Sequence, residues 1–433
     1  MHIQVLLLCS GQSKRMWPLS DKIFFDYLGK TVLEHQIEKL LSFPEFDEIH
    51  IVGNEENIEK IQALVLPKFA GKKIEWTFSI QKKLEEGMLG GVLDAQDKID
   101  MKKPFLLMSS NDFVENFFFA NLLQKAAKSD SDILVCGKNV EKYFPGGYLV
   151  YNSQGFVEKI LEKPGMGNEP SHMINLVFHF FRNPKNIFHF LQKERKLNSG
   201  HYGYENGLQK LFDSGQKCEV VEYDGFWQAL KYPWDHLRLM EFFLLRLSGQ
   251  DIHPSAQISP HASILGDVVL EEGVKVFDFA VINGPAYIGK NCIIGNHVLV
   301  RNSHIGADSL IGHGTEVARS YFLRRVRTHQ NYVGDSVLDE NISFGAGTRT
   351  GNLRLDEGNI SVKIFEEKIP THSQKIGLFC GENVRVGINT SIMPGVKIGK
   401  NSFIGASLCL EEDIPDRSFK KGVFQSVEKE NRY

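Results

Sequence analysis

Three features that would place this chain in a special class are missing from its sequence. None of the six cysteines forms a Cys-x-x-Cys pair, so they resemble buried apolar residues of a reducing compartment. No apolar run reaches the length of a membrane span, and Val5–Cys9 is too short for a signal peptide. The net charge of −3 provides no basic field for a nucleic acid. We therefore expect a cytoplasmic protein with no membrane or nucleic-acid partner.

The first 248 residues alternate short apolar runs with amphipathic stretches. This pattern is typical of an α/β sheet of mostly parallel order. At 433 residues the chain is also too long for one ordinary core, so we expect two domains. Strands are predicted at Ile3–Cys9, at a segment ending in His50–Gly53 and at Phe105–Ser109, and helices at Thr31–Leu41, Asn121–Lys128 and Trp234–Leu247.

Residues 249–433 follow a different rule, a six-residue period. An aliphatic residue occupies every sixth position from Ile252 to Val300, and a second series runs from Val386 to Leu410. Such a period fits neither a helix nor a hairpin. It predicts a solenoid in which each flat face takes one hexapeptide with its apolar side chain inward. Residues 353–378 lack the period, so we expect a protruding loop there.

The loop after the first predicted strand is suited to binding phosphate. Residues 8–22 read LCSGQSKRMWPLSDK, in which Gly11 and Ser13 precede Arg15 and Lys22. Main-chain N–H groups in such a loop can surround a triphosphate, and cationic side chains add charge. One glycine-containing loop is weak evidence by itself, because many such loops are ordinary turns.

This loop resembles the opening Gly-x-Gly-Thr-Arg-Met-x-Pro-Leu-Ser motif of the sugar-1-phosphate nucleotidyltransferases. Lys22 precedes Gly29-Lys30 by the spacing that the lysine of the family's Pro-Lys-Pro motif shows. The resemblance implies a Rossmann-like domain over residues 1–248 that binds a nucleoside triphosphate and a sugar 1-phosphate. Further elements match in order: Gln81, Gly87 and Met88 for the nucleotide base, Asp112 for Mg²⁺, and Gly147, Glu162 and Asn175 for the sugar phosphate.

The reaction of that family explains these residue types. A sugar phosphate attacks the α-phosphorus of the triphosphate and pyrophosphate leaves, so charge builds on nonbridging oxygens and fixed cations dominate catalysis. Arg15 and Lys22 would supply positive charge, Asp112 would hold Mg²⁺ and Glu162 would accept hydrogen bonds from sugar hydroxyls. Alternatives remain open: Asp112 as a helix N-cap, Lys22 as a solvated loop charge and Glu162 within an ordinary turn.

The N-terminal resemblance has departures. Ser13 replaces the second motif glycine and Lys14 the threonine, and the prolines beside the lysine are Asp21 and Ile23. The place of the family's second metal carboxylate aligns with Ala229. Asp235 is near that place, but we expect it to open the last helix of the domain.

The segment His329-Gln330-Asn331-Tyr332-Val333-Gly334-Asp335, with Asn352 beyond it, carries a second resemblance. It is similar to the acetyltransferase half of the bifunctional enzymes that make UDP-N-acetylglucosamine, most closely the archaeal type. There the histidine is the general base, the tyrosine and asparagine hold the amino-sugar phosphate and acetyl-CoA supplies the acyl group. Imidazole suits an amine that attacks a thioester near pH 7. Arg301 resembles a phosphate-binding arginine.

The resemblance also implies a fold and an assembly for residues 249–433. Hexapeptide acyltransferases are left-handed parallel β-helices that form trimers, with active sites between neighbouring prisms, so we expect a homotrimer. Departures again occur: Ala318, Gly358 and Ser361 replace family polar residues, although Arg319 could substitute for the lysine at 318. The set Arg319, Arg324, Arg325 and Arg327 is either a basic cluster or a solvated corner.

Three hypotheses follow from these patterns. The leading one is a sugar-1-phosphate nucleotidyltransferase with an acyltransferase-type β-helix that also acetylates an amino-sugar phosphate. The second keeps nucleotidyl transfer and makes the β-helix a trimer scaffold. The third, suggested by Ala229 and Ala318, is a non-catalytic sugar-nucleotide-binding protein. Turnover with Mg²⁺ separates the third from the others.

We predict that single substitutions separate the two activities. His329→Ala should lower CoA-dependent acylation by about 10²- to 10⁴-fold, the usual effect of losing a general base, and leave nucleotidyl transfer near wild type. Lys22→Ala should do the reverse. Thiol release from acetyl-CoA and pyrophosphate release measure the two reactions. A wild-type protein that releases no thiol with any amino-sugar phosphate would make the β-helix a scaffold.

Overall fold

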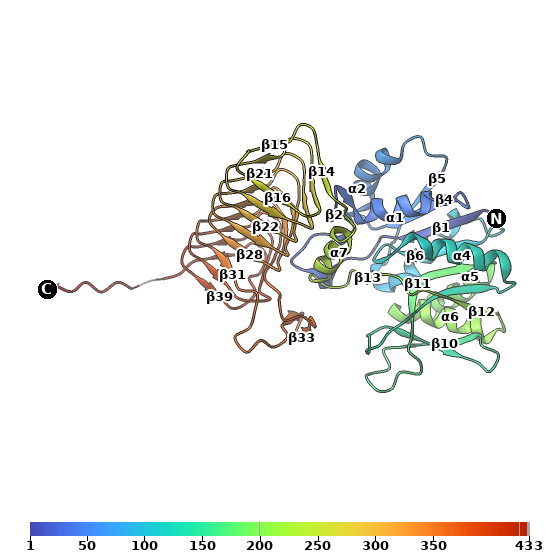
Figure 1. The fold of residues 1–433 in the computed structure, drawn as a ribbon. Coiled ribbons are helices and arrows are strands. Elements are labelled where there is room, and N and C mark those ends of the chain that lie inside the picture. The colour runs from blue at the N-terminus through green and yellow to red at the C-terminus, as the bar shows by residue number, and fades with distance from the viewer. Residues whose placement is uncertain (199, 424, 431–433) are drawn as a thin grey trace. The chain divides into compact units, whose positions relative to one another are not determined.

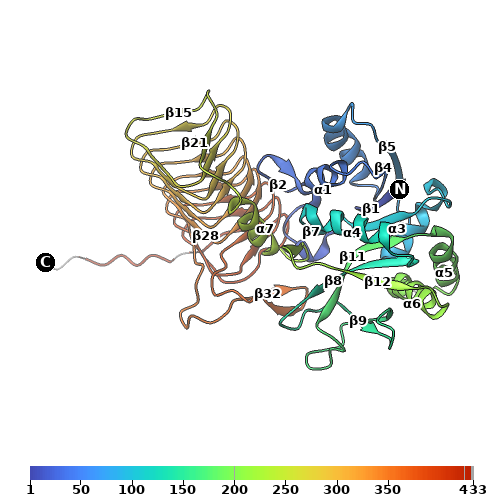
Figure 2. The ribbon, with the colours of Figure 1, turned by 45° about the vertical axis from the view of Figure 1, so that its right-hand side comes forward.

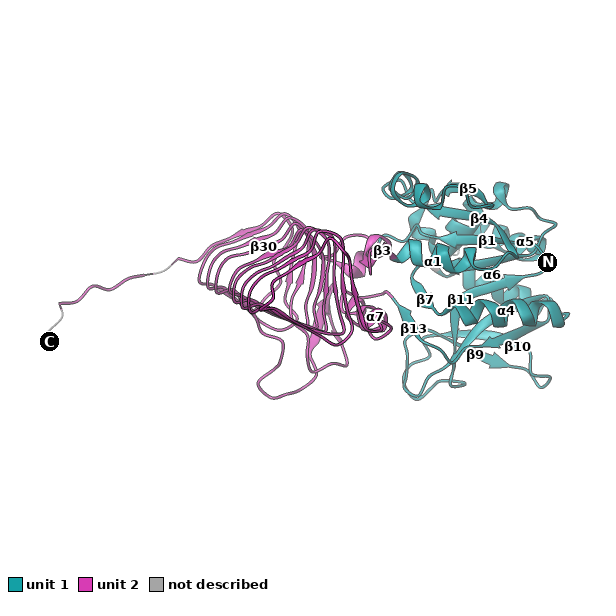
Figure 3. Ribbon diagram, turned by 45° about the horizontal axis from the view of Figure 1, so that its top comes forward, with its two compact units in different colours: residues 1–12, 32–229 teal, residues 13–31, 230–433 magenta. Residues whose placement is uncertain are grey.

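The computed structural model describes residues 1–198, 200–423 and 425–430 of the chain. They form two compact units: residues 1–12 with 32–229, called the sheet unit, and residues 13–31 with 230–433, called the β-helix unit (Figure 3). The sequence pattern changes at residue 248/249, whereas compactness groups the loop 13–31 and the helix after residue 230 with the β-helix. The two divisions therefore differ in where they assign these segments.

The sheet unit is built on a nine-stranded mixed sheet, in which seven strands follow the order β10-β9-β11-β6-β1-β4-β5 and β8 joins β11 to β12 (Figures 1 and 2). Strands β6, β1, β4 and β5 are parallel, whereas β11 is antiparallel to β6, β8 and β9. The expected parallel order is thus confirmed for one part of the sheet only. The strands are β1 (Ile3–Leu8), β4 (Phe46–Gly53), β5 (Glu75–Ile80), β6 (Phe105–Ser109), β8 (Ile133–Asn139), β9 (Gly147–Tyr151), β10 (Val157–Glu162), β11 (Met173–Phe181) and β12 (Cys218–Glu222).

Helices cover both faces of this sheet. On one face α3, α5 and α6 share a buried cluster with β1 and β6, and on the other Phe118 and Phe119 of α4 pack against Phe178. The helices are α1 (Val32–Leu41), α2 (Ile58–Lys60), α3 (Gly87–Asp94), α4 (Asn116–Lys128), α5 (Pro184–Lys196) and α6 (Gly203–Asp213), with the single turns η3 (Ile61–Val65), η4 (Leu66–Phe69), η5 (Leu84–Glu86), η6 (Gln96–Lys98) and η7 (Gly200–Tyr202). The predicted helices are therefore present, and α4 begins earlier than expected.

The position of β1 decides where a ligand can bind. β1 lies between β4 and β6 in the sheet. After β1 the chain adds β4 and β5 on one side, and it later adds β6 on the other side, so the strand order reverses between β1 and β6. In open α/β sheets, ligands bind outside the carboxyl ends of the strands at such a reversal. Leu8 and Ser109 pair as the last residues of these strands. The loops that follow them carry Gly11 and Asp112.

The β-helix unit consists of three parallel sheets that form the sides of a prism. The first contains β14 (Gln250–Ile252), β17 (Val268–Leu270), β20 (Ala286–Ile288), β23 (His304–Ile305), β26 (Tyr321–Arg324), β29 (Val337–Glu340), β34 (Phe379–Cys380) and β37 (Lys397–Ile398). The second contains β15 (Gln257–Ile258), β18 (Lys275–Val276), β21 (Ile293–Ile294), β24 (Leu310–Ile311), β27 (Arg327–Thr328), β30 (Ser343–Phe344), β35 (Arg385–Val386), β38 (Phe403–Ile404) and β40 (Phe419–Lys420). The third contains β16 (Ser263–Leu265), β19 (Val281–Asn283), β22 (Leu299–Arg301), β25 (Glu316–Ala318), β28 (Tyr332–Gly334), β31 (Arg349–Thr350), β36 (Ser391–Ile392) and β39 (Cys409–Leu410).

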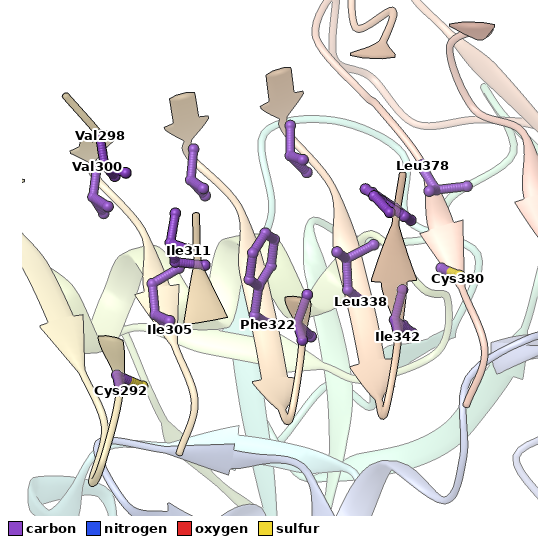
Figure 4. Packing of buried hydrophobic residues seen from close by; sticks show 14 of the residues in the cluster. Cys292, Val298, Val300, Ile305, Ile311, Phe322, Leu338, Ile342, Leu378 and Cys380 are labelled. Atoms are coloured by element: carbon purple, nitrogen blue, oxygen red, sulfur yellow. The ribbon is translucent and has the colours of Figure 1, made fainter. Parts of the chain in front are cut away.

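The six-residue period of the sequence becomes the interior of the prism. The predicted inward positions from Leu270 to Val300 and from Val386 to Leu410 are buried in one cluster, and Ile252, Ile258 and Ile264 cover its open end. Figure 4 shows labelled side chains from successive strands pointing into this interior. Each fully buried aliphatic side chain contributes about 1.5–3 kcal/mol. The predicted fold class, a Rossmann-like α/β domain followed by a parallel β-helix, is confirmed.

The stretch without the period leaves the stack of coils, as expected. The chain departs after β31 and returns at β34, and between them β32 (Ser361–Ile364) and β33 (Glu367–Pro370) form an antiparallel hairpin (Figure 1). Leu353 and Lys375 bridge the base of this excursion. Leu355 and Phe365 are exposed on it. The predicted protruding loop is therefore confirmed.

Two expectations from composition have mixed outcomes. Five of the six cysteines are buried, but Cys409 is exposed, so the prediction that all six are buried is wrong at that position. Cys409 lies in β39, where it precedes the inward Leu410 and therefore points to the outer side. Among the described residues, no helix combines the length and apolarity needed to cross a membrane.

One side of the β-helix is covered by other segments of its own unit. The rings of Tyr287, His304 and Tyr321 stack along the first sheet with centroids 4.7 and 4.8 Å apart. The ring centre of Tyr27, in the two-residue strand β2 (Asp26–Tyr27), lies 5.2 Å from the ring centre of Tyr321. Its hydroxyl is 2.6 Å from Nδ1 of His236 on α7 (Asp235–Leu244). The same loop contains η1 (Lys14–Met16), η2 (Lys22–Phe24) and β3 (Lys30–Thr31).

We predict that His236 makes the protein sensitive to acid. Burial lowers the pKa of His236 from 6.5 to about 3, so between these values the unfolded chain binds a proton that the folded chain does not. Stability must therefore fall as the pH drops through this window, by roughly 3 kcal/mol for this group between pH 6.5 and pH 4. His236→Phe should lose less stability than wild type between pH 7 and 4, at the cost of about 1 kcal/mol for the lost Tyr27 bond at pH 7.

Thermal midpoints at pH 7, 5.5 and 4 measure this difference. The other buried histidines are common to both proteins and cancel from the comparison. Midpoints that fall in parallel for wild type and His236→Phe would contradict the prediction.

Candidate functional site

The start of the predicted phosphate loop is held by two asparagines. The side-chain amide of Asn54 donates to the carbonyl of Ser10 at 3.1 Å, and that of Asn57 donates to the carbonyl of Cys9 at 2.8 Å. Gly11 follows and is exposed. A Cβ placed on Gly11 would lie 4.0 Å from Nδ2 of Asn111, on the loop after β6. The two loops at the reversal of strand order are therefore neighbours.

Asp112 begins a short strand, β7 (Asp112–Val114), that pairs with β13 (Trp227–Ala229). The indole N–H of Trp227 donates to Oδ1 of Asp112 at 2.9 Å. From α1, Gln36 donates to the carbonyl of Asp112 at 2.7 Å and Lys39 to that of Val114 at 2.6 Å. Because α4 begins at Asn116, the alternative of Asp112 as a helix N-cap is excluded. The carboxylate is instead held at a strand end.

The strand pair also shows where a second metal-binding carboxylate would lie. Ala229 is directly opposite Asp112, so their side chains lie on the same face of the antiparallel pair. No group of three or more His, Cys, Asp or Glu able to hold a metal occurs among the described residues. Mg²⁺ commonly binds through one or two carboxylates together with substrate phosphates. The residues present therefore fit an Mg²⁺ ion that Asp112 shares with a triphosphate.

Gln81 is buried and its amide is engaged within the protein. Nε2 donates to the carbonyls of Lys83 at 3.0 Å and of Gly87 at 2.7 Å, and Oε1 accepts from the Ser10 hydroxyl. Gly87 has φ of 57° and begins α3, with the half-buried Met88 next to it. Gln81, which follows β5, is thus hydrogen-bonded both to the turn at Gly87 and to the phosphate loop. Donation from its amide N–H groups to a nucleotide base would require one of these bonds to break, whereas Oε1 can still accept a second hydrogen bond.

The predicted sugar-phosphate residues come from three adjacent strands. Gly147 of β9 pairs with Glu162 of β10, and a Cβ on Gly147 would collide with the Glu162 carboxylate. Glycine is therefore required at 147 if Glu162 is to keep this position. On β11, Oδ1 of Asn175 accepts a hydrogen bond from Nε2 of His179 at 3.1 Å, and Nδ1 of His179 lies 2.6 Å from the Tyr204 hydroxyl.

One acidic residue of this region was missed by the sequence patterns. Burial raises the pKa of Glu205, on α6, to about 7, and the charge of Glu162 adds to this rise. Its Oε2 is buried without a hydrogen-bond partner among the described residues. The contact depends on α6 packing against β10, which no local motif reveals. Glu205 is thus a further carboxyl group beside the predicted sugar residues.

The remaining residues of the phosphate loop belong to the β-helix unit. Ser13 has φ of 52° and its hydroxyl donates to Asp21 at 3.2 Å. Arg15 is exposed, with its guanidinium 5.7 Å from the centre of the Tyr232 ring. Lys22 is only 7% exposed, and its ammonium donates to the carbonyl of Leu230 at 2.7 Å. Burial excludes the alternative of Lys22 as a solvated loop charge.

The second candidate site lies on the third sheet of the β-helix. Nε and Nη2 of Arg319 donate to the two carboxylate oxygens of Asp335 at 2.6 and 2.7 Å. The amide of Asn352 donates to the same carboxylate and, at 3.1 Å, to the hydroxyl of Tyr332. Two predicted residues, Tyr332 and Asn352, are therefore brought together. Because Nε and Nη2 of Arg319 are both bonded to Asp335, Arg319 does not reproduce a free lysine at 318.

His329 is placed on the same coil, before the corner at Gln330. Its main-chain N–H donates to Asn331 Oδ1 at 2.6 Å, while the Asn331 amide reaches the carbonyls of Gly345 and Thr348 in the next coil. Asn331 thus joins the two motif segments that the sequence singled out. The imidazole of His329 is exposed.

The arginines do not form one basic cluster. Arg301 donates twice to Glu316 Oε1, at 3.0 and 2.7 Å. Arg324 and Arg325 share Glu340, with distances of 3.5 and 3.2 Å, and Arg327 points outward from the second sheet. The hypothesis of one cluster that includes Arg319 is therefore wrong, because the prism turns a corner between residues 319 and 324.

Family models of known proteins match both parts of the chain. The family model "Nucleotidyl transferase" matches residues 4–230, and "Bacterial transferase hexapeptide (six repeats)" matches residues 267–302 and 379–408. A protein named "Bifunctional protein GlmU" from Methanocaldococcus jannaschii is 30% identical over 429 residues, 96% of this chain and 97% of the relative. A "Bifunctional sugar-1-phosphate nucleotidylyltransferase/acetyltransferase" from Sulfurisphaera tokodaii is 29% identical over 427 residues, 97% of this chain and 100% of the relative.

One solved structure, titled apo-UDP-glucose pyrophosphorylase, superposes with a TM-score of 0.47 at 14% sequence identity, over 57% of this chain and 99% of that chain. At this level of similarity nothing about function follows.

The register of β7 and β13 predicts the effect of restoring a second carboxylate. Ala229→Asp should tighten Mn²⁺ binding to the nucleotide-free protein about tenfold or more, because metal affinity follows the number of charged oxygen ligands. Titration followed by the electron paramagnetic resonance of free Mn²⁺ measures this affinity without catalysis. Gln228→Glu is the matched control, since the adjacent strand residue points to the opposite face. Equal affinities for wild type and Ala229→Asp would contradict the prediction.

Proposed function

Since this chain belongs to the family of bifunctional sugar-1-phosphate nucleotidylyltransferase/acetyltransferases, we propose that it joins a nucleoside triphosphate and a sugar 1-phosphate into a nucleoside diphosphate sugar. One observation carries this function. Five strands are consecutive neighbours in one sheet, in the order β10-β9-β11-β6-β1. β1 leads into the phosphate loop, β6 precedes Asp112, and the other three carry the proposed sugar residues. Residues that are far apart in sequence therefore share one region of the sheet unit.

The proposed roles follow from the chemistry at each position. Arg15 and Lys22 provide positive charge to the phosphates, and Asp112 holds Mg²⁺ in an orientation set by the Trp227 indole. The metal supplies charge neutralisation on the phosphate oxygens where charge builds in the transition state. Glu162 and Asn175 accept hydrogen bonds from the sugar, and the bond from His179 fixes the Asn175 amide. Gly11, Ser13, Gly87 and Met88 line the nucleotide side in this proposal.

We propose acetyl-CoA-dependent transfer to an amino-sugar phosphate as the second activity. The network of Arg319, Tyr332, Asp335 and Asn352 supports it, because a buried carboxylate that pairs with a partly exposed arginine and accepts from an amide is typical of a built binding site. His329 is the proposed base and Arg301 a phosphate ligand. We also propose a cytoplasmic homotrimer, with sequence domains at residues 1–248 and 249–433.

A matrix of nucleoside triphosphates against sugar 1-phosphates, read by pyrophosphate release, tests the proposed function. At least one pair should give Mg²⁺-dependent turnover. Asp112→Asn should lower that turnover about 100-fold or more, because it removes a charged metal ligand worth several kcal/mol while keeping the shape.

Asp130→Asn provides the matched control. The side chain of Asp130 is 87% exposed and pairs only loosely with Lys217, so its loss should leave the rate unchanged. Rates of wild type and Asp112→Asn that agree within twofold would remove Asp112 from the site. Absence of turnover for every pair would remove the nucleotidyl transfer itself.

A further inference from the structure

The loop that carries Arg15 and Lys22 is built into the β-helix unit. Its main chain reaches a buried carboxylate on β29: the N–H of Ser20 donates to Oδ2 of Asp339 at 2.7 Å. The other oxygen of Asp339 accepts from the N–H of Glu340 at 2.8 Å. Asp339 is completely buried, with an exposed fraction of 0%. Ser20 lies between the two cations in sequence, so this bond holds the chain that joins them.

Other coils of the β-helix hold the flanks of the same loop. The Tyr321 hydroxyl donates to the carbonyl of Asp26 at 2.5 Å, and the N–H of Leu28 donates to Nε2 of His304 at 3.3 Å. At the other end, the Trp17 indole donates to Asp416 at 2.9 Å. These partners come from three further places along the hexapeptide region. The loop conformation is therefore determined by the β-helix and not by the loop sequence alone.

Asp339 differs from these other hydrogen-bond partners because burying its carboxylate is unfavourable for folding. Burial raises its pKa to about 6, although the N–H groups of Ser20 and Glu340 and the Ser20 side chain oppose that rise by binding the ionised form. No cation bonds to this carboxylate among the interactions described for it. A buried carboxylate without a cation disfavours folding unless its hydrogen bonds offset the lost hydration. An apolar residue at 339 would give a simpler core but would leave the N–H of Ser20 without an acceptor.

We propose that Asp339 is a positioning residue for nucleotidyl transfer, which it supports from the hexapeptide domain by fixing Ser20 between Arg15 and Lys22. The inference rests on the proposed function, since it assigns the two cations to the phosphates. Displacement of charged groups by about 1 Å from the reacting phosphates can cost 10²-fold in rate. The first activity thus depends on the second domain, even though none of the sugar-binding residues proposed for it belongs to that domain.

The test compares Asp339→Asn and Asp339→Ala with wild type in the full-length protein. Asparagine keeps the volume but can accept only one of the two N–H groups, whereas alanine accepts neither. We expect kcat of pyrophosphate release to fall about 10-fold for asparagine and about 100-fold for alanine. KM for the sugar 1-phosphate should stay within twofold, because Gly147, Glu162 and Asn175 belong to the sheet unit.

Thr390→Val is the matched control for general damage to the β-helix. Thr390 is fully buried in another coil and donates to the Gly405 carbonyl at 3.1 Å, so the substitution removes a buried hydrogen bond that does not involve the loop. It should lower the thermal midpoint but leave kcat unchanged. Amide hydrogen exchange adds a readout without catalysis: residues 13–31 should exchange faster in both Asp339 variants and not in Thr390→Val.

Two results would overturn the proposal while the proposed function stands. In the first, wild type is active and both Asp339 variants keep kcat within twofold. In the second, kcat falls equally in Thr390→Val at the same loss of thermal midpoint, which would make the effect one of stability. A wild type without turnover for any substrate pair would instead overturn the proposed function and this inference with it.

Discussion

The pairing of β1 with parallel neighbours on both sides is the constraint on which the candidate nucleotide site depends. Because parallel strands end at one edge of the sheet, Gly11 after β1 and Asp112 after β6 emerge together. Hydrogen bonds from Asn54 and Asn57, on the chain after β4, then hold the first of these loops. The antiparallel strands β9 to β11 extend the same sheet and add Glu162 and Asn175. Without the central pairing, the loops that carry Gly11 and Asp112 would not be neighbours.

Local patterns in the sequence were sufficient for the repeated part of the fold. A prism coil needs one inward apolar side chain on each face, so the six-residue period marks β-strands, interior positions and even the excursion at 353–378. Strands such as β6 were equally clear, because a short apolar run ended in polar residues. In the site, the ordered motifs identified Asp112, Gly147 and Glu162 by resemblance. Their roles in binding remain predictions.

The residues that escaped prediction share one property, a contact across a long sequence separation. Trp227 reaches Asp112 through the pairing of β13 with β7, and Glu205 meets Glu162 because α6 packs on β10. Neither contact leaves a periodic signal. The grouping of residues 13–31 with the β-helix was missed for the same reason, since its bonds join a loop near the start of the chain to coils near the end. Hydrogen bonds between residues far apart in the chain follow no regular sequence spacing, so they could not be predicted from the sequence pattern.

The bond between Ser20 and Asp339 spans 319 residues, and that between Trp17 and Asp416 spans 399. A chain emerging from a ribosome at roughly 5 to 20 residues per second would wait on the order of 15 to 65 s between making Ser20 and making its acceptor. Throughout that interval the strands of the sheet unit can pair, but the N–H of Ser20 lacks the acceptor that fixes it in the finished protein. The earliest loop of the chain is thus among the last segments to acquire its final conformation, and synthesis must pass most of the hexapeptide coils before it can do so.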